Sequence, residues 1–191
     1  MIFETIITSI DISGNVHVTP FGIQLQDNLV VISPYKPSAT LNNILATQQA
    51  VMNLTDDVRV FAGALTRRQA WTLVPTQKIL GFRLLETLVH KELKLVEVIE
   101  DAQRPRLLME VVHEEQHHPF SGFNRAQAAV IELAVLASRL HMLPKEKVLS
   151  ELSYLKIAID KTAGERELLA WSWLTEKIEN FYAEQSGENF A

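Results

Sequence analysis

The chain has 191 residues, of which 47% are hydrophobic and 21% charged, and its formal net charge is -5. This is a globular composition that argues against a nucleic-acid scaffold, which usually has a basic face, and the lack of cysteine excludes disulfides, thiolate nucleophiles and Cys-ligated metals. The N-terminus has no basic leader and carries Glu4, and the most apolar stretch is short for a membrane span and contains Glu132 and Arg139, so we expect a soluble cytoplasmic protein with no membrane partner.

The first third of the chain has the pattern of β-strands. Its β-branched runs are separated at residues 13–15 and 26–28, and both separations have the composition of hairpin turns. In the second run, Pro20 cannot donate a hydrogen bond to a neighbouring strand, so we expect a bulge or a sheet edge there. Gly22 lacks a side chain, which allows a ligand or another backbone to approach.

The middle of the chain predicts both helices and strands. Residues 40–48 suit a short helix with Leu41, Ile44 and Leu45 facing inward, and residues 50–55 suit a strand. Residues 56–71 begin with two aspartates, which favour a helix N-terminus, so we predict a helix there. Residues 82–115 predict strands, with a loop at 101–105.

Helical patterns follow Pro119. Residues 126–143 are apolar on nearly all sides, which indicates a central buried helix, and a second helix has an apolar stripe. The stripe consists of Val148, Leu152, Leu155 and Ile159. Thr162 and Glu165 have the spacing of a capping box, which predicts the start of a third helix.

The predicted organisation is therefore α+β. A β-rich domain spans residues 1–118, a three-helix domain spans residues 119–185, and residues 186–191 form a loose tail.

Residues 113–117 match H-E-x-x-H, the signature of zinc metalloproteases. That mechanism needs both histidines on one face of a helix, with the glutamate between them acting as a general base. Here the motif ends a strand-like run, and an extended chain would place His113 and His117 about 13 Å apart at roughly 3.3 Å per residue. The sequence offers no obvious third ligand, so we predict a solvated, charged loop between domains and no metal site.

Residues 34–44 form a corner rich in proline, hydroxyl and amide side chains. Ser38 or Thr40 can cap the following helix, and the prolines can fix the corner. However, a cap needs one hydroxyl, and the corner supplies two together with Lys36. Hydroxyl donors, an ammonium group and the amides of a helix N-terminus can together bind a phosphate. At this point a structural corner and a phosphate site are both open.

The order of these segments resembles the FMN-binding split-barrel superfamily, which includes flavin reductases and pyridoxamine-phosphate-oxidase-like proteins. The resemblance is carried by residues 5–25 and 30–58. It is closer to an uncharacterised domain-of-unknown-function branch that adds a C-terminal helical unit. That unit opens with a motif similar to residues 122–126, Gly-Phe-Asn-Arg-Ala. The resemblance extends over nearly the full chain and implies a split barrel that binds FMN, followed by the helices.

The resemblance also implies three groups of cofactor-binding residues. The group for the FMN phosphate consists of Lys36, Ser38 and Thr40. The group along the flavin ring, acting largely through backbone, consists of Thr19, Pro20, Phe21 and Gly22. The group near the ribityl chain or ring consists of Asn53 and Thr55. Arg125 is considered as a further phosphate contact, with an ordinary helix start capped by Asn124 as the alternative.

The resemblance implies two classes of function. The first is an FMN-dependent oxidoreductase that takes hydride from a nicotinamide nucleotide or another reduced donor. The second is a non-catalytic module that binds FMN or another phosphorylated ligand. No catalytic residue is predicted, because the flavin itself carries the redox chemistry. The resemblance further implies a homodimer with FMN at the subunit interface, where a second copy would cover the open face of the ring.

Overall fold

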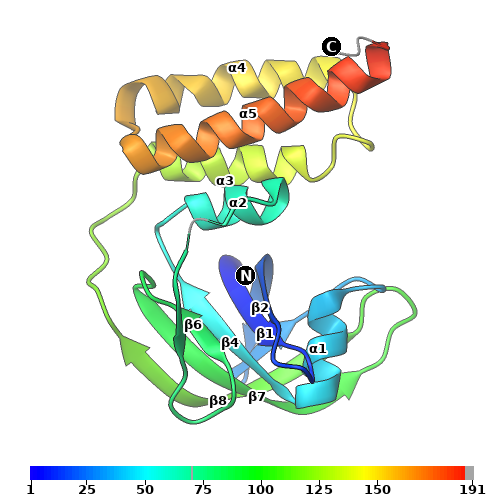
Figure 1. Cartoon of the computed structure of the whole chain (residues 1–191), viewed down its shortest axis with the longest axis vertical. Helices are drawn as coiled ribbons and strands as arrows, with labels where there is room; N and C mark the ends of the chain where they lie inside the picture. The colour runs from blue at the N-terminus through cyan, green and yellow to red at the C-terminus, as the bar shows by residue number, and fades with distance from the viewer. Residues whose placement is uncertain (70, 188–191) are drawn as a thin grey trace. The chain divides into compact units, whose positions relative to one another are not determined.

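The computed structural model describes residues 1–69 and 71–187 of the chain (Figure 1). Of the predicted tail at 186–191, residues 188–191 lie outside the described residues. The described chain forms two compact units, one made of residues 1–56 and 71–120 and the other of residues 57–69 and 121–187. The α+β prediction of a barrel followed by three helices is confirmed. The division differs from the predicted boundary at 118/119, because the segment beginning at Asp57 groups with the later helices.

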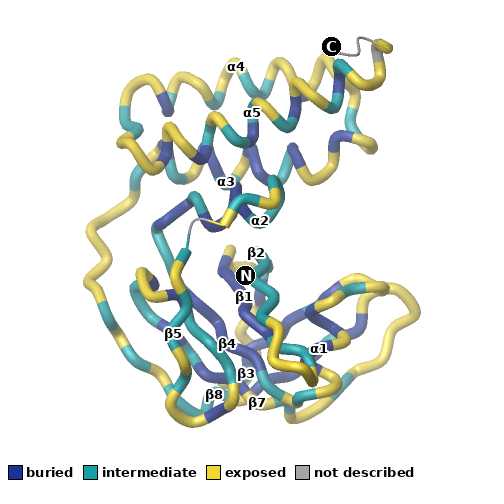
Figure 2. Tube along the Cα trace, in the orientation of Figure 1, coloured by how far each residue is buried: buried dark blue, intermediate teal, exposed yellow. Residues whose placement is uncertain are grey.

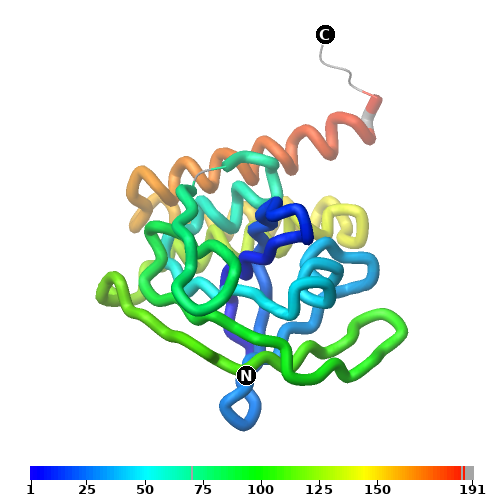
Figure 3. Tube along the Cα trace, turned by 60° about the horizontal axis from the view of Figure 1, so that its bottom comes forward, coloured from blue at the N-terminus to red at the C-terminus, as the bar shows by residue number. Residues whose placement is uncertain are grey.

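The first unit contains a closed barrel of six antiparallel strands in the order β1-β2-β3-β8-β7-β4. The strands are β1 (Ile2–Ile10), β2 (Val16–Gln26), β3 (Leu29–Ile32), β4 (Gln49–Leu54), β7 (Val89–Ile99) and β8 (Arg106–Gln116). Closure pairs β1 with both β2 and β4, so the first strand of the chain has neighbours on both sides. Figure 3 shows the barrel strands from below.

Both predicted hairpin turns are present. The carboxylate of Asp11 accepts hydrogen bonds from the backbone N–H groups of Ser13 (2.8 Å) and Asn15 (2.9 Å), which closes the β1–β2 turn. In the β2–β3 turn, Asp27 and Asn28 have φ values of 49° and 66°. Two successive residues with positive φ form the type of turn whose twist suits a tight hairpin.

The prediction of a sheet edge at Pro20 is confirmed. β2 pairs with β1 along Val16–Gln24 but with β3 only from Gln24 onward, so Pro20 lies outside the β2–β3 pairing. At Gly22 the close neighbour is a side chain of the adjacent strand: a Cβ atom there would lie 2.9 Å from Cγ2 of Ile2. The space that the missing side chain leaves is therefore filled from the adjacent strand.

The barrel core is covered at one side by α1 (Ala39–Thr47), which contacts β1, β2 and β4. The buried core residues shared by the strands and α1 are Ile7, Ile23, Val30, Ile32, Leu41, Ile44, Ala50, Met52, Leu93, Leu107 and Met109. Figure 2 shows this buried path along the strands in dark blue. The predicted inward position of Leu45 is wrong: its side chain is 42% exposed, because only Leu41 and Ile44 of the predicted trio share the buried face.

A small hairpin of β5 (Leu73–Pro75) and β6 (Phe82–Leu84) lies beside the barrel and contacts β4 and β1 through β6. The hydroxyl of Thr8 donates to the carbonyl of Phe82, and the side-chain carbonyl of Asn53 accepts from the N–H of Leu84 at 2.8 Å. The hairpin therefore covers polar side chains of β1 and β4 and removes them from water.

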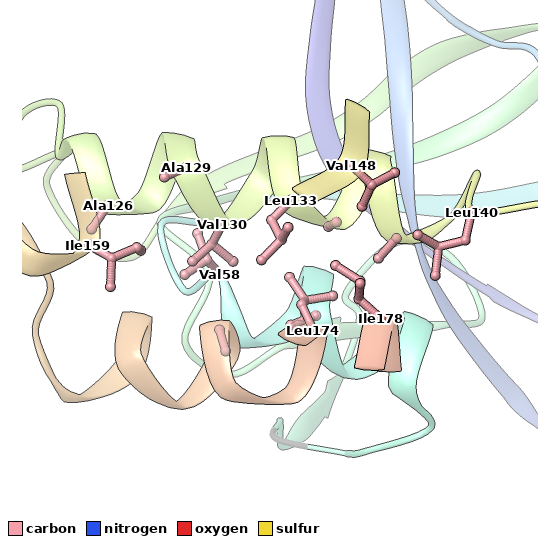
Figure 4. Close-up of a cluster of buried hydrophobic side chains, with 14 of the residues drawn as sticks. Val58, Ala126, Ala129, Val130, Leu133, Leu140, Val148, Ile159, Leu174 and Ile178 are labelled. Atoms are coloured by element: carbon pink, nitrogen blue, oxygen red, sulfur yellow. The ribbon is translucent and has the colours of Figure 1, made fainter. Parts of the chain in front are cut away.

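The second unit contains four helices: α2 (Arg59–Thr66), α3 (Arg125–Ala137), α4 (Lys145–Thr162) and α5 (Glu165–Ser186). Figure 4 shows its core, where Val58 lies among side chains of α3 and α5 such as Val130 and Leu174. The prediction of a buried α3 and of an apolar stripe on α4 is confirmed. α2 joins this unit because its buried residues need an apolar partner, and α3 and α5 supply it.

The helix starts test two expectations. The side-chain oxygen of Asn124 accepts a hydrogen bond from the N–H of Ala126 at 2.7 Å, so Asn124 caps α3. This is the ordinary helix start that the sequence analysis gave as the alternative for Arg125. The capping box at Thr162 is wrong, because Thr162 is the last residue of α4 and α5 begins after Gly164. There the carboxylate of Glu167 accepts from the N–H of Gly164 at 2.9 Å. Among the described helices, none is both long and apolar enough to cross a membrane.

Candidate functional site

The predicted phosphate corner lies at the N-terminus of α1. Ser38 is the N-cap residue, with an extended backbone, and its Oγ accepts from the N–H of Leu41 at 3.4 Å. The cap therefore uses Ser38, one of the two hydroxyls that the sequence offered. Thr40 lies in the first helical turn and is only 1% exposed. Its Oγ1 finds no hydrogen-bond partner in the part of the chain that the structure describes.

Lys36 joins this corner to the β7–β8 loop. Its Nζ lies 3.1 Å from Oε2 of Glu100 and donates to the carbonyl of Asp101 at 3.0 Å. Its backbone N–H also donates to the carbonyl of Gln103 at 2.8 Å. The side chains of Lys36 and Glu100 are 39% and 74% exposed, so this ion pair is solvated and can exchange for another anion at little cost.

The predicted ring-contacting residues lie consecutively on β2. Thr19 and Phe21 pair across the ladder with Ile7 and Thr5, and Phe21 packs against the barrel core. Successive side chains of a strand point to opposite faces, so Pro20 points away from Phe21. A ligand on one face of this segment would meet the side chains of alternate residues only.

Asn53, predicted near the ribityl chain, is fully buried and bonded within the barrel. Its Nδ2 donates to the carbonyl of Ile6 at 3.2 Å and lies 3.4 Å from Oγ1 of Thr8, while its Oδ1 accepts from Leu84. The amide thus joins β1, β4 and β6. Thr55 follows β4 in a loop and is half-buried. The cofactor roles of these nine residues stay predictions.

The structure brings together a second set of polar residues that the sequence analysis did not assemble. On β7 and β8, cross-strand pairing places His90 opposite Glu115 and Glu92 opposite His113. Because side chains alternate along a strand, these four and His117 lie on one face, and we call the five residues the His–Glu ladder. Nδ1 of His90 lies 2.9 Å from Nε2 of His117, and Nε2 of His90 lies 3.4 Å from the Glu92 carboxylate. The only sequence signal is H-x-E at 90–92, which resembles the start of H-x-E-x-H at 113–117.

Burial and hydrogen bonding set the charge states in the ladder. Burial lowers the pKa of His90 and outweighs the neighbouring Glu92, and burial together with the positive charge of Arg83 lowers the pKa of His117. Burial by itself would raise the pKa of Glu92, but hydrogen bonds to its carboxylate lower it overall. Those bonds come from three consecutive backbone N–H groups, of Gln77 (2.7 Å), Lys78 (2.7 Å) and Ile79 (2.9 Å). At neutral pH the ladder therefore combines neutral imidazoles of His90 and His117 with an ionised Glu92.

The H-E-x-x-H segment is extended, as predicted, because β8 continues to Gln116. The helical geometry of a metalloprotease motif is therefore not formed by His113 and His117. The prediction of a solvated loop is wrong for residues 113–116, because pairing with β7 holds them in the sheet and partly buries His113 and Glu115.

A pocket of about 590 Å³ lies elsewhere in the first unit. It is bordered by the β1–β2 turn, the end of α1 and the loop between β5 and β6, and its lining includes Ile10, Thr47, Leu80 and Phe82. None of the nine predicted cofactor residues lines it. The pocket and the corner at Thr40 are therefore separate features of the unit.

A family model described as the N-terminal domain of a protein of unknown function (DUF447) matches residues 3–118, which is more than half of the chain. The chain belongs to the DUF447 family. The family's C-terminal domain, also described as a protein of unknown function, matches residues 124–176. Among curated proteins, none matches the chain.

Solved structures similar to this DUF447 protein share its fold. The FMN-bound protein MM1853 from Methanosarcina mazei, also of DUF447, has a TM-score of 0.79 at 18% identity, over 92% of this chain and 94% of that one. The 2-nitrobenzoate 2-nitroreductase NbaA of Pseudomonas fluorescens has a TM-score of 0.52 at 23% identity, over 60% and 64%. Nitrilotriacetate monooxygenase component B from Bacillus cereus has a TM-score of 0.55 at 15% identity, over 65% and 75%. The resemblance to split-barrel flavoproteins of the flavin-reductase type is thus confirmed at the level of fold.

Proposed function

We propose that this DUF447 protein binds FMN at its split barrel, with the phosphate at the N-terminus of α1. The observation that carries the proposal is the Thr40 hydroxyl, buried in the first helical turn and without a hydrogen-bond partner in the described chain. Buried polar groups are nearly always bonded, so the Thr40 hydroxyl lacks a partner that a phosphate at the helix N-terminus would supply once the side chain turned toward it. The likeness to an FMN-bound member of the same family, over 92% of the chain, supports FMN as that anion.

The residues of the corner fit a phosphate in kind. Thr40 offers a hydroxyl, the first turn of α1 offers backbone N–H groups, and Lys36 offers an ammonium group. Lys36 would exchange its solvated partner Glu100 for the phosphate, which is favourable because a hydrogen bond to a dianionic group is stronger than an exposed ion pair. Ser38 would keep its capping role and add its hydroxyl at the edge of the site.

FMN, when bound, would supply hydride-transfer chemistry, so the protein itself needs to hold the flavin, orient it and exclude water. We propose that Thr19, Pro20, Phe21 and Gly22 border the ring through their backbone, on the part of β2 that lacks β3 as a neighbour. The unpaired side of that segment leaves backbone groups that a flavin ring can use. A reduced nicotinamide nucleotide is the donor that we propose, and the barrel would form a homodimer around the two cofactors.

A second candidate is a module that binds FMN without turnover. The observation that favours it is Asn53, whose side-chain amide is committed to β1 and β6. A side chain held in this way can support the flavin site but is not free to contact a substrate. This alternative shares the FMN site and differs only in the absence of a reaction.

One experiment separates these functions. The purified protein is freed of ligand, titrated with FMN and with FAD, and followed by flavin fluorescence. The FMN complex is then mixed anaerobically with NADH or NADPH. Binding of FMN and bleaching of its absorption support the oxidoreductase, whereas binding without bleaching by either donor supports the module. Failure of a folded protein to bind FMN, or a preference for FAD, would contradict the proposal.

A further inference from the structure

We propose that His90, His113 and Glu115 of the His–Glu ladder bind one divalent transition-metal ion, with Zn²⁺ as the best fit. Each residue offers one ligand atom, and the three atoms lie within 4.8 Å of one another. Zinc bonds of about 2.0–2.2 Å would bring these atoms to roughly 3.5 Å apart, so they need to close by only about 1 Å. Small side-chain rotations supply such a movement without a change in the strands.

The strand register explains why these three side chains converge. His113 and Glu115 are two residues apart on β8 and point to the same face, and His90 lies directly opposite Glu115 on β7. Paired strands hold opposing Cβ atoms about 4.5–5.5 Å apart, which is a rigid frame for ligands. The prediction of no metal site from the sequence considered only His113 and His117 as ligands. It did not include His90, which β7 places opposite Glu115.

His113 shows that the site is short of a partner. Its Nε2 is buried and has no hydrogen-bond partner in residues 1–69 and 71–187, and the nearest carboxylate oxygen of Glu115 is 3.8 Å away. A buried ring nitrogen without a partner is unusual. A cation between His113 and Glu115 would satisfy both groups at once.

The surrounding groups position the ligands. Nε2 of His117 lies 2.9 Å from Nδ1 of His90. The two imidazole rings are stacked, with their centroids 5.0 Å apart. The Nε2 group of Gln77 donates to Glu115 at 2.7 Å. Contacts of this kind orient metal ligands, and their removal typically weakens metal binding about 10–100-fold. His117 is thus a positioning residue, unlike in the metalloprotease motif, where it would be a ligand.

The local charge also favours a cation. Glu92 and Glu115 bring two carboxylates to the ladder. Arg83 is a nearby cation, and its guanidinium donates to the carbonyl of Leu84 at 3.0 Å. Two imidazoles and one carboxylate suit Zn²⁺ and its neighbours rather than Mg²⁺ or Ca²⁺, which prefer oxygen ligands. Three protein ligands would leave a coordination position for water or a small ligand.

The test is a metal titration of the full-length protein after treatment with EDTA, with and without FMN. Zn²⁺ is measured by competition with a chromogenic chelator, and Co²⁺ by its visible absorption. We expect one ion per chain. His113→Ala and Glu115→Gln should each weaken binding at least tenfold. His117→Ala should weaken it but keep one ion per chain. His118→Ala, which changes an exposed histidine next to the ladder, should leave binding unchanged.

His113→Gln serves as a second variant if His113→Ala alters folding, which far-UV circular dichroism reports. No binding below millimolar metal, or equal binding by the wild type and folded His113 and Glu115 variants, would overturn the proposal. Equal losses in the His113 and His118 variants would also overturn it. These outcomes are independent of FMN binding, so they do not decide the proposed function.

Discussion

Nζ of Lys36 lies 3.1 Å from Oε2 of Glu100 and 3.0 Å from the carbonyl oxygen of Asp101. These contacts connect the corner before α1 to the β7–β8 loop. Because both charged side chains are partly exposed, the pair stabilises the fold little and leaves the ammonium group available to a competing anion.

Lys36→Ala is therefore expected to weaken FMN binding about tenfold or more while leaving the fold intact, since a charge-assisted hydrogen bond contributes roughly 1.5–3 kcal/mol. Glu100→Gln should preserve or strengthen binding, because it removes the competing carboxylate. Fluorescence titration with FMN measures both effects. Lys147→Ala, which removes an exposed lysine of α4, is the control. Wild-type affinity in Lys36→Ala would place the phosphate elsewhere.

Thr40→Val tests the buried hydroxyl directly. Without FMN, we expect the free energy of unfolding to stay equal or rise by about 1 kcal/mol, because the substitution removes a buried group that has no partner in the described chain. With FMN, the affinity should fall. Thr5→Val is the matched control: its hydroxyl donates to the carbonyl of Phe21 at 3.0 Å, so that variant should be less stable. Denaturant unfolding with and without FMN provides the measurement, and a loss of stability in ligand-free Thr40→Val would contradict the assignment.

Asn53→Ala is expected to destabilise the barrel by about 2–6 kcal/mol. The change leaves the buried N–H of Leu84 without its acceptor and creates a cavity, and each effect costs roughly 1–3 kcal/mol. Chemical unfolding of ligand-free protein measures it. Asn42→Ala, on the exposed side of α1, should change stability by less than about 0.5 kcal/mol. A similar small change for Asn53→Ala would show that its bonds with β1 and β6 do not stabilise the fold.

His17 should contribute to acid sensitivity. Burial lowers its pKa below the ordinary value of 6.5, so the unfolded chain binds the proton more readily than the folded protein does. The stabilising contribution is present above pH of about 6.5 and is lost as the pH falls toward the lowered pKa. His17→Gln should therefore flatten the decrease in melting temperature between neutral and mildly acidic pH. The exposed His141→Gln should not, and equal pH profiles for wild type and His17→Gln would refute the expectation.

A homodimer is expected for the FMN-bound protein. Ile2 and Leu25, on the paired strands β1 and β2, are 59% and 56% exposed, which provides apolar surface for a two-fold contact. Light scattering should give twice the chain mass of 21.6 kDa. Leu25→Asp should shift the mass toward the monomer, while Ile157→Asp on α4 should not. A monomer at micromolar concentration with full FMN occupancy would exclude a shared site.

Several local elements of this fold could be predicted from the sequence. Hairpin turns at 13–15 and 26–28 and the apolar α3 depend on residues close together in the chain, so turn chemistry and periodicity predicted them. The sequence also predicted a capped start of α1 but left Ser38 and Thr40 open as the cap, and the structure shows Ser38. The resemblance to a known superfamily then supplied the barrel, which propensity alone does not, because closure pairs β1 with β4 across some forty residues.

Contacts between side chains far apart in the sequence could not be predicted in this way, because they depend on how the elements pack. The N–H of Leu84 donates to the side-chain carbonyl of Asn53, because the β5–β6 hairpin folds back onto β4. The ammonium group of Lys36 donates to the carboxylate of Glu100, because the β7–β8 loop folds back toward α1. The segment at 57–69 joined the helices rather than the barrel, since packing and not sequence position decides where an amphipathic helix is buried. The His–Glu ladder shows the same limit. His90 became a neighbour of His113 through strand register, and a shift of one residue would have turned it to the other face of the sheet.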